Sequence, residues 1–498
     1  MVYAFTLPTT SHLSFQTHLS SSTHPSLPQA ASTARHALRT ALKTHKRLPR
    51  GPQQDAHLTT ILTTLTDYLP YLSALSTGIS NKPAETIEEI ELTLLSEIQS
   101  EWRPTLSSIS LKTSTTTRAR VRGQGLDFEI AFVLTTLGYV LSGLAHTSVI
   151  RTLYASTTPT PEQRTAAVQT ATKHLLQASA VHSLLASSPS FAHVARSVSG
   201  GSSVPDLDPA AQAALSSLAL AEATLLAVLK DDSYVAACIQ ARNPNDKDWM
   251  VRAAEIPKVR AHLFARLCIR AAEYAEQARA GLGTVGADGR AGIEEDLVKY
   301  ARVLSRVARG RACRFFGVDA ELAGEIGEGI AWLRAAKGAL GVRGAVAEQK
   351  ENVGKSRGFS RFKQGWMERR EERKMEKDAG VRESMVKGEL GPGDSAGREE
   401  EGRVIEMLET KWVRMNDTIN TQLIPPSADL VANLPSGRDI HSPPGAYRLP
   451  SLDEEQLVRM RAPPAEDEFG PGSDVDDSEE ESAVVRDSVP ERTDSAYY

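Results

Sequence analysis

The sequence predicts a mainly α-helical protein, a solenoid-like stack of long antiparallel helices with a small β-hairpin or sheet in its N-terminal part and a disordered acidic tail. Three observations support this fold class. Apolar residues recur at three- and four-residue steps along most of the chain. Residues 102–122 instead alternate β-branched and polar side chains. Residues 451–498 hold 15 acidic against 4 basic side chains, too much charge for a packed core.

The N-terminal third is expected to combine short extended segments with helices. Residues 1–20 can supply a short strand and a loop, and the hairpin or small sheet at 102–122 ends this part. Between them the apolar periodicity predicts helices at about 33–46, at 55–78 with a kink near Pro70, and at 84–99.

Residues 130–150 raise the question of a membrane span, because these 21 residues contain no Asp, Glu, Lys or Arg. About 20 apolar residues suffice to cross a bilayer core. Polar side chains nevertheless recur through the run, and the imidazole of His146 would be expensive in lipid without a partner. Since no second such segment is apparent, we expect residues 130–150 to belong to a buried core helix.

Helices are expected to dominate the chain beyond residue 125. Thr160, Pro161 and Gln163 combine a capping box with a proline in the first helical position, and Asp208 precedes a proline in the same way. Short links between Ala-rich segments favour antiparallel neighbours. Further helices are predicted at about 246–280, 291–316, 319–340 and 401–422.

The last third contains a charged insertion at 342–400 and a Pro-rich extended return at 423–450. Glutamates interleave the cations of the insertion, which favours a solvated helix held by ion pairs over a nucleic-acid patch. We expect one domain over residues 1–450, followed by the disordered acidic tail at 451–498. With the tail set aside, the charge is only mildly positive and gives no nucleic-acid footprint.

No catalytic or metal-binding motif is recognisable. Cys238, Cys268 and Cys313 are odd in number and far apart, so neither a disulfide framework nor a zinc site follows. Residues 281–286 fit the G-x-G-x-x-G pattern but follow an Ala-rich helix, which favours an interhelical loop over a dinucleotide site. We therefore expect no enzyme, no metal and no cofactor, with an enzyme of dispersed active site as the alternative.

Two stretches resemble the Bro domain, the boomerang-shaped domain of Alix and its fungal relatives. Residues 119–145 are similar to the segment in which a hairpin leads into a long core helix, and the Leu-Gly-Tyr step of that helix matches Leu137, Gly138 and Tyr139. The resemblance implies that residues 1–450 form a self-contained Bro domain, with a charged insertion longer than that of Alix.

The second stretch is similar to the exit from the last Bro helix. Asn416 and Asp417 begin an Asn-Asp-x-Ile sequence, and Pro425 follows where the chain turns into an extended return. The N-terminal residues 3–15 and the Pro-rich closing run are similar to the fungal pH-response members of the family.

The resemblance implies a partner and a groove. Bro domains bind the C-terminal amphipathic helix of the filament-forming ESCRT-III subunit in an apolar groove, and residues 218–241 resemble the groove-forming helix. Lys230 would meet an acidic residue of that helix. Ordinary core packing remains an equal alternative for each leucine, because apolar residues recur with the same helical spacing in a core face and in a groove. The implied contact residues are Leu225, Leu226, Leu229, Lys230, Val235 and Ile239.

The resemblance also implies a role as an adaptor of alkaline ambient-pH signalling. Assembly on ESCRT-III would bring a calpain-like protease to a zinc-finger transcription factor, downstream of a membrane pH-sensing complex. We expect a cytoplasmic protein recruited to plasma-membrane or endosomal puncta through its partners, with no nucleic acid bound. An α-solenoid adaptor with unrelated partners stays open as the alternative.

Overall fold

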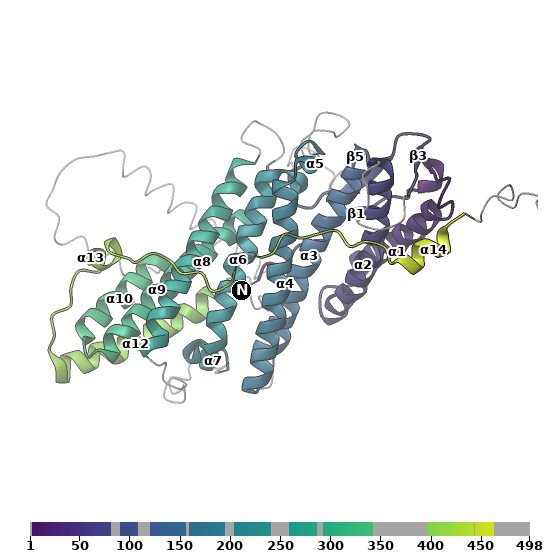
Figure 1. Cartoon of the computed structure of the whole chain (residues 1–498). Helices are drawn as coiled ribbons and strands as arrows, with labels where there is room; N and C mark the ends of the chain where they lie inside the picture. The colour runs from purple at the N-terminus through teal and green to yellow at the C-terminus, as the bar shows by residue number, and fades with distance from the viewer. Residues whose placement is uncertain are drawn as a thin grey trace, which may run out of the picture.

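The computed structural model shows a row of long helices standing side by side in chain order (Figure 1). The main neighbours in this row are α1 and α2, α2 and α3, α3 and α4, α4 and α6, α6 and α8, α8 and α9, and α9 and α10. The predicted mainly α-helical stack is thus confirmed. The structure describes residues 2–80, 90–107, 120–155, 159–194, 204–240, 258–285, 292–341, 396–442 and 444–462.

The helices that build the stack are long, and four short helices accompany them in the described part of the chain. The long helices are α1 (Leu27–Arg47), α2 (Pro52–Ser80), α3 (Leu126–Leu153), α4 (Pro161–Ser187), α6 (Pro209–Asp231), α8 (Lys258–Thr284), α9 (Glu295–Leu322), α10 (Ile326–Leu340) and α12 (Arg398–Met415). The short ones are α5 (Pro189–Ala192), α7 (Ser233–Gln240), α13 (Ser427–Ala432) and α14 (Glu454–Met460), and the π-helical turn η6 (Asn416–Asn420) follows α12.

The predicted sheet forms, but with a third strand from the N-terminus. β4 (Gln99–Arg103) pairs antiparallel with both β1 (Thr9–Thr10) and β5 (Val121–Gln124). A second small sheet joins β2 (Leu19–Ser20) to β3 (Thr93–Leu94).

The helix predicted at 84–99 is wrong over its described part. Residues 90–98 contain no helix, Thr93 and Leu94 form β3, and Gln99 begins β4. Ser21 donates a hydrogen bond to the Glu91 carbonyl, and the Leu95 amide donates one to the His18 carbonyl. Pairing with the N-terminal segment therefore overrides the local apolar periodicity.

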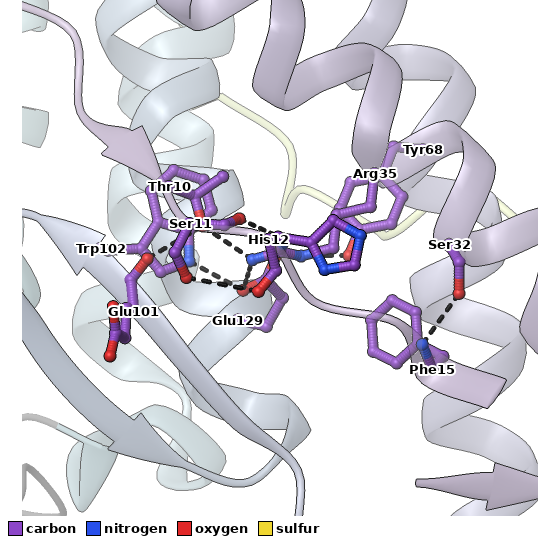
Figure 2. A network of polar contacts seen from close by, with 10 residues as sticks. All are labelled: Thr10, Ser11, His12, Phe15, Ser32, Arg35, Tyr68, Glu101, Trp102 and Glu129. Atoms are coloured by element: carbon purple, nitrogen blue, oxygen red, sulfur yellow. Dashed lines mark hydrogen bonds and ion pairs between the residues drawn. The ribbon is translucent and has the colours of Figure 1, made fainter. Parts of the chain in front are cut away.

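A buried polar centre fixes the N-terminal elements against α3 (Figure 2). The Arg35 guanidinium of α1 donates to the Glu129 carboxylate of α3 with Nε–Oε1 at 2.8 Å, and both side chains are buried. Trp102 of β4 donates its indole N–H to the same carboxylate at 2.7 Å, and the Tyr68 hydroxyl of α2 donates at 3.3 Å. Arg35 also donates to Thr10 of β1. One carboxylate thus receives hydrogen bonds from three elements.

The apolar run at 130–150 lies within α3, whose most hydrophobic window is 89% buried in the protein. The structure contains a second helix of comparable hydropathy, α6, with a window 72% buried. The sequence-based statement that there is no second such segment was therefore wrong. Length and composition admit both helices as spans, whereas their burial against neighbouring helices matches the expected core role of α3.

The predicted helix starts agree with the observed caps. The Thr160 hydroxyl accepts from the Gln163 amide, and the Gln163 side chain accepts from the Thr160 amide, which completes the capping box of α4. The Asp208 carboxylate accepts from the first amides of α6. The loop expected at 281–286 is wrong over its described part. Residues 281–284 belong to α8, where Gly281 packs against Ala214 of α6.

The extended return predicted at 423–450 is visible from residue 433 as a strap that crosses the stack (Figure 1), whereas residues 427–432 form the short helix α13. The strap, residues 433–453, leads from α13 back to α14. Asp439 accepts hydrogen bonds from Arg270 and Tyr274 of α8, and the Arg438 amide donates one to the Arg266 carbonyl of the same helix. At its far end the Ala462 amide donates to the Thr23 carbonyl before α1, and Leu457 is buried. The disordered tail predicted at 451–498 is therefore wrong over its described part, because residues 454–460 form α14 and pack beside α1. The insertion at 342–395 and residues 463–498 lie outside the described residues.

Candidate functional site

The predicted groove residues lie at the C-terminal end of α6 and on α7. The structure buries the three leucines, because Leu225 and Leu226 are 0% exposed and Leu229 is 2% exposed. Val235 of α7 is also buried. Of the predicted set, only Lys230 and Ile239 are partly accessible. These side chains therefore do not form a continuous exposed stripe; four of them belong to the core and two to the surface.

A small apolar pocket lies where these residues approach the surface. It is lined by Leu229 and Ile239 together with Leu153 at the end of α3, Pro159 before α4, Ala236 of α7 and Arg164 of α4. Four helices therefore converge on one opening. Its floor is the edge of the core at Leu229, and its rim is the partly exposed Ile239.

The surroundings of this pocket are basic. Arg164 lines the pocket itself, and Lys230 follows Leu229 directly in sequence. The Asp231 carboxylate oxygen Oδ2 lies 4.0 Å from Lys230 Nζ and 3.8 Å from Arg260 Nη1. Arg164 thus lines the apolar pocket, and two further cations share the Asp231 carboxylate at the end of α6.

A second buried ionic centre fixes α7 against the rest of the stack. Asp232, between α6 and α7, accepts from the Val235 amide and pairs with Arg314 of α9. Arg314 and Arg311 also donate to the buried Glu401 carboxylate of α12, with 2.8 Å between Arg311 Nε and Glu401 Oε2. Burial alone would raise the pKa of Glu401, but the two guanidinium groups lower it below its ordinary value. The pocket wall supplied by α7 thus rests on α9 and α12.

The family-motif residues of α3 are packing residues. Leu137 and Tyr139 are buried, and Gly138 lies directly under the imidazole of His182 on α4, so that a methyl group there would collide with the ring. Burial lowers the pKa of His182 to about 4, so the ring is neutral at pH 7, and it is hydrogen-bonded to Gln212 of α6. Gly138 therefore permits the close approach of α3, α4 and α6.

The second motif closes the turn after α12. Asn416 is buried and makes two hydrogen bonds with the Gln422 backbone, one in each direction, at 2.9 and 3.0 Å. This bridge holds Thr421 in the left-handed region, with a φ of 49°. Asp417 is exposed and Pro425 is half-buried. Asn416 thus directs the chain from α12 into the extended return.

These features agree with the comparisons with known proteins. The model of the BRO1-like domain matches residues 3–434. The chain belongs to the BRO1-like domain family. The pH-response regulator protein palC of Emericella nidulans is 66% identical over 514 aligned residues, which span 100% of both chains.

Two solved structures share the fold of this Bro domain. The ALIX BRO1 CHMP4C complex superposes with a TM-score of 0.51 at 14% identity, over 91% of this chain and 99% of that chain. ALIX in complex with the SIVmac239 PYKEVTEDL late domain gives a TM-score of 0.52 at 14% identity, over 91% of this chain and 51% of that one. At this identity the likeness establishes the fold and nothing finer.

Several side chains that line the pocket carry no recognisable signal of their own in the sequence. Leu153 ends α3, Pro159 precedes α4 and Arg164 lies in its first turn, and all three meet α7 only in the folded chain. The capping box at Thr160 was the one local signal, because it fixes where α4 begins and hence where Arg164 lies. Over the described ranges no group of His, Cys, Asp or Glu could hold a metal ion.

Proposed function

We propose that this Bro domain is an adaptor of fungal ambient-pH signalling that binds the C-terminal helix of the filament-forming ESCRT-III subunit. One observation carries the proposal: the chain is 66% identical to a pH-response regulator along the whole length of both proteins. The fold that it shares with ALIX BRO1, which has been solved in a CHMP4C complex, supports the choice of an ESCRT-III partner.

The pocket between α3, α4, α6 and α7 is the proposed docking point. An amphipathic helix binds by inserting apolar side chains one turn apart into a complementary depression. Ile239 on the rim and Leu229 beneath it supply apolar contacts, and Arg164 and Lys230 supply charge. The guest helix that fits is therefore apolar on one face and acidic along its border.

The remaining predicted residues support this site from within. Leu225, Leu226 and Val235 pack beneath it and keep α6 and α7 in position, since all three are buried. An adaptor of this kind needs surface and no catalytic centre. In the proposed role the bound ESCRT-III filament recruits the chain from the cytoplasm to plasma-membrane or endosomal puncta. There it promotes processing of a zinc-finger transcription factor by a calpain-like protease, downstream of the pH-sensing complex.

The test is a titration of the full chain with a fluorescently labelled C-terminal helix of the fungal ESCRT-III filament subunit. We expect saturable binding with a Kd on the order of micromolar. Ile239→Asp places a carboxylate at the apolar rim and should weaken binding at least about tenfold, as loss of a central contact does. Lys230→Glu should weaken binding less, and more at low salt than at high salt.

Both positions are partly accessible, so neither change introduces a fully buried charge. Leu229→Asp, by contrast, would bury a carboxylate in the core and report on folding. The matched control for Lys230→Glu is Lys173→Glu, an exposed position on α4. Unchanged affinity in Ile239→Asp, with helical content intact, would remove the pocket from the proposal. Absence of binding by the wild-type chain would refute the ESCRT-III partner.

A further inference from the structure

A cationic surface lies on α1, at one end of the row of helices and away from the proposed groove (Figure 1). Arg39, Lys43 and Arg47 follow one another at four-residue steps on α1 and so share one face of the helix. Arg103 of β4 and Arg120, next to β5, lie beside this face. We call this surface the α1 basic face and define it as Arg39, Lys43, Lys46, Arg47, Arg103 and Arg120.

The members of the α1 basic face are close enough to affect one another. Desolvation and then the charges of Arg39, Arg120 and Arg47 lower the pKa of Lys43. Desolvation and then the charges of Arg103 and Arg120 lower the pKa of Lys46. Like charges at this spacing repel one another and gain from an anionic partner.

Few acidic side chains neutralise this surface. Arg120 lies 3.8 Å from Glu101, measured between Nη1 and Oε2, and Glu101 also pairs with Arg122. Among the described residues, no other member of the α1 basic face forms an ion pair. The first acidic residue of the sequence is Asp55, so α1 itself contains no carboxylate. An excess of positive charge therefore remains.

The C-terminus of the described chain lies next to the same helix. The Ala462 amide donates a hydrogen bond to the Thr23 carbonyl at 2.7 Å, and the Ser26 hydroxyl donates to the Met460 carbonyl. Figure 1 shows α14 beside α1. From Ser26 to Lys43 the helix rises by about 26 Å, at 1.5 Å per residue.

Residues 463–498 begin at this point and carry the opposite charge. They contain 12 Asp and Glu against 2 Arg. A chain of this length can span roughly 120 Å at about 3.3 Å per residue, several times the distance required. Tethering also makes the encounter intramolecular, which favours this segment over an untethered anion.

We propose that the acidic segment 463–498 docks on the α1 basic face of its own chain. The contact is electrostatic, with glutamates and aspartates of the segment facing the six cations. It would screen their mutual repulsion and keep this surface from other anionic partners, including membranes. The proposal is independent of the ESCRT-III groove, which lies on other helices.

The test is zero-length carboxyl-to-amine crosslinking of the full chain, followed by mass spectrometry. The reaction joins a carboxylate to a lysine only when the two touch. We expect segment 463–498 to be joined to Lys43 and Lys46, and far less to Lys173, an exposed lysine on α4. The yield should fall several-fold at about 0.5 M salt, where the Debye length is about 4 Å.

Two variants keep both reporter lysines in place. Arg47→Glu reverses an exposed charge of the α1 basic face and should reduce the crosslinks at Lys43 and Lys46 several-fold. Arg302→Glu makes the same change on an exposed site of α9 and should leave them unchanged. Replacement of Glu479, Glu480 and Glu481 by Gln lowers the negative charge of the segment. The carboxylates that remain in the segment should then crosslink less to Lys43 and Lys46.

Three results would overturn the proposal. Equal crosslinking to Lys173 would mean that the segment does not prefer the α1 basic face. Crosslinks formed only between isotopically labelled and unlabelled copies would assign the contact to a second molecule. The third result combines two observations: the wild-type chain floats with phosphatidylserine vesicles as strongly as the Glu-to-Gln variant, and it shows no crosslink at Lys43. This result would mean that the α1 basic face binds membranes and not segment 463–498.

Discussion

The two buried arginine–carboxylate centres of this Bro domain differ in what they connect and in how completely they are hydrogen-bonded. In the N-terminal centre, Arg35 donates hydrogen bonds from Nε to Glu129, from Nη1 to the Ser11 carbonyl and from Nη2 to the Thr10 hydroxyl. In the C-terminal centre, Arg314 binds Glu401 and Asp232, while its Nη1 has no hydrogen-bond partner among the described residues.

The difference indicates different roles. The first centre joins two strands and three helices through residues that all lie within the first 129 positions. The second joins α9 to α12 across the insertion at 342–395 and depends mainly on charge. A buried network in which every polar group is hydrogen-bonded favours one arrangement of its side chains, as in the first centre. The second centre leaves one Arg314 nitrogen without a hydrogen bond among the described residues, so its stability depends more on the attraction between opposite charges.

Removal of the first carboxylate should produce the largest effect. Glu129→Ala leaves the Arg35 guanidinium buried without a counter-charge and takes an acceptor from Trp102. We expect a loss of about 3–5 kcal/mol in the free energy of unfolding, as for other broken buried pairs. Urea denaturation measures it, with the exposed Glu97→Ala as control. A loss no larger than that of the control would show that the centre does not stabilise the fold.

A third buried carboxylate, which lacks an arginine partner, sharpens the comparison through its pH dependence. Burial raises the pKa of Glu222 to about 7, even though Tyr300 and the Tyr3 amide donate to it. The folded state therefore retains the proton longer than the unfolded state. The protonated Glu222 therefore contributes to the free energy of unfolding. This contribution is complete below the ordinary pKa of a glutamate and is lost as the pH rises through 7.

Glu222→Gln should remove this dependence. Between pH 5 and 8 the wild-type chain should lose up to about 3 kcal/mol through this group, at 1.36 kcal/mol per pKa unit, while the variant should not. Denaturation curves at both pH values measure the difference. Parallel behaviour of the two proteins would contradict the assignment to Glu222.

The second arginine centre should respond more weakly to a neutral substitution. Glu401→Gln keeps the shape but removes the charge that Arg311 and Arg314 share, and we expect a loss of about 2 kcal/mol. The wild-type advantage should also disappear as the pH falls, because pairing lowers the pKa of Glu401 and its stabilisation is lost on protonation. Hydrogen exchange should rise in α12 first, and an equal rise in α1 would contradict the separation of the two centres.

The smallest expected effect concerns the turn that leads away from the second centre. Asn416→Ala removes both hydrogen bonds to the Gln422 backbone and should cost about 1 kcal/mol. A thermal melt measures it, with Asn420→Ala on the same turn as control. Equal shifts of Tm in the two variants would show that the bridge is not specific.

Sequence patterns predicted the elements whose signals are local. The uncharged core of α3, the capping box of α4 and the Asp208 cap of α6 each depend on neighbouring residues, and each was confirmed. The error at 90–99 arose because Thr93 and Leu94 pair with β2 and Gln99 pairs with β5, all distant in the sequence. Local patterns carry no information on such partners.

The candidate site was less predictable for a related reason. Leu225, Leu226 and Leu229 have the spacing of a groove and equally that of a core, and only packing decides between the two. Arg35 and Glu129 lie 94 positions apart, and Arg164 reaches the pocket from a different helix than Ile239. Their proximity is a property of the stack and leaves no trace in either stretch alone.

The strap from α13 to α14 has a consequence for how this architecture can change in size. Helical repeat proteins grow by adding helix pairs, and each added helix widens the row by about 9 Å. Here a single extended chain crosses the row and is attached at α8 and beside α1. Every added helix would require about three more residues of strap. Insertions in the links between helices escape this requirement, and the longest undescribed stretch, residues 342–395, lies in such a link.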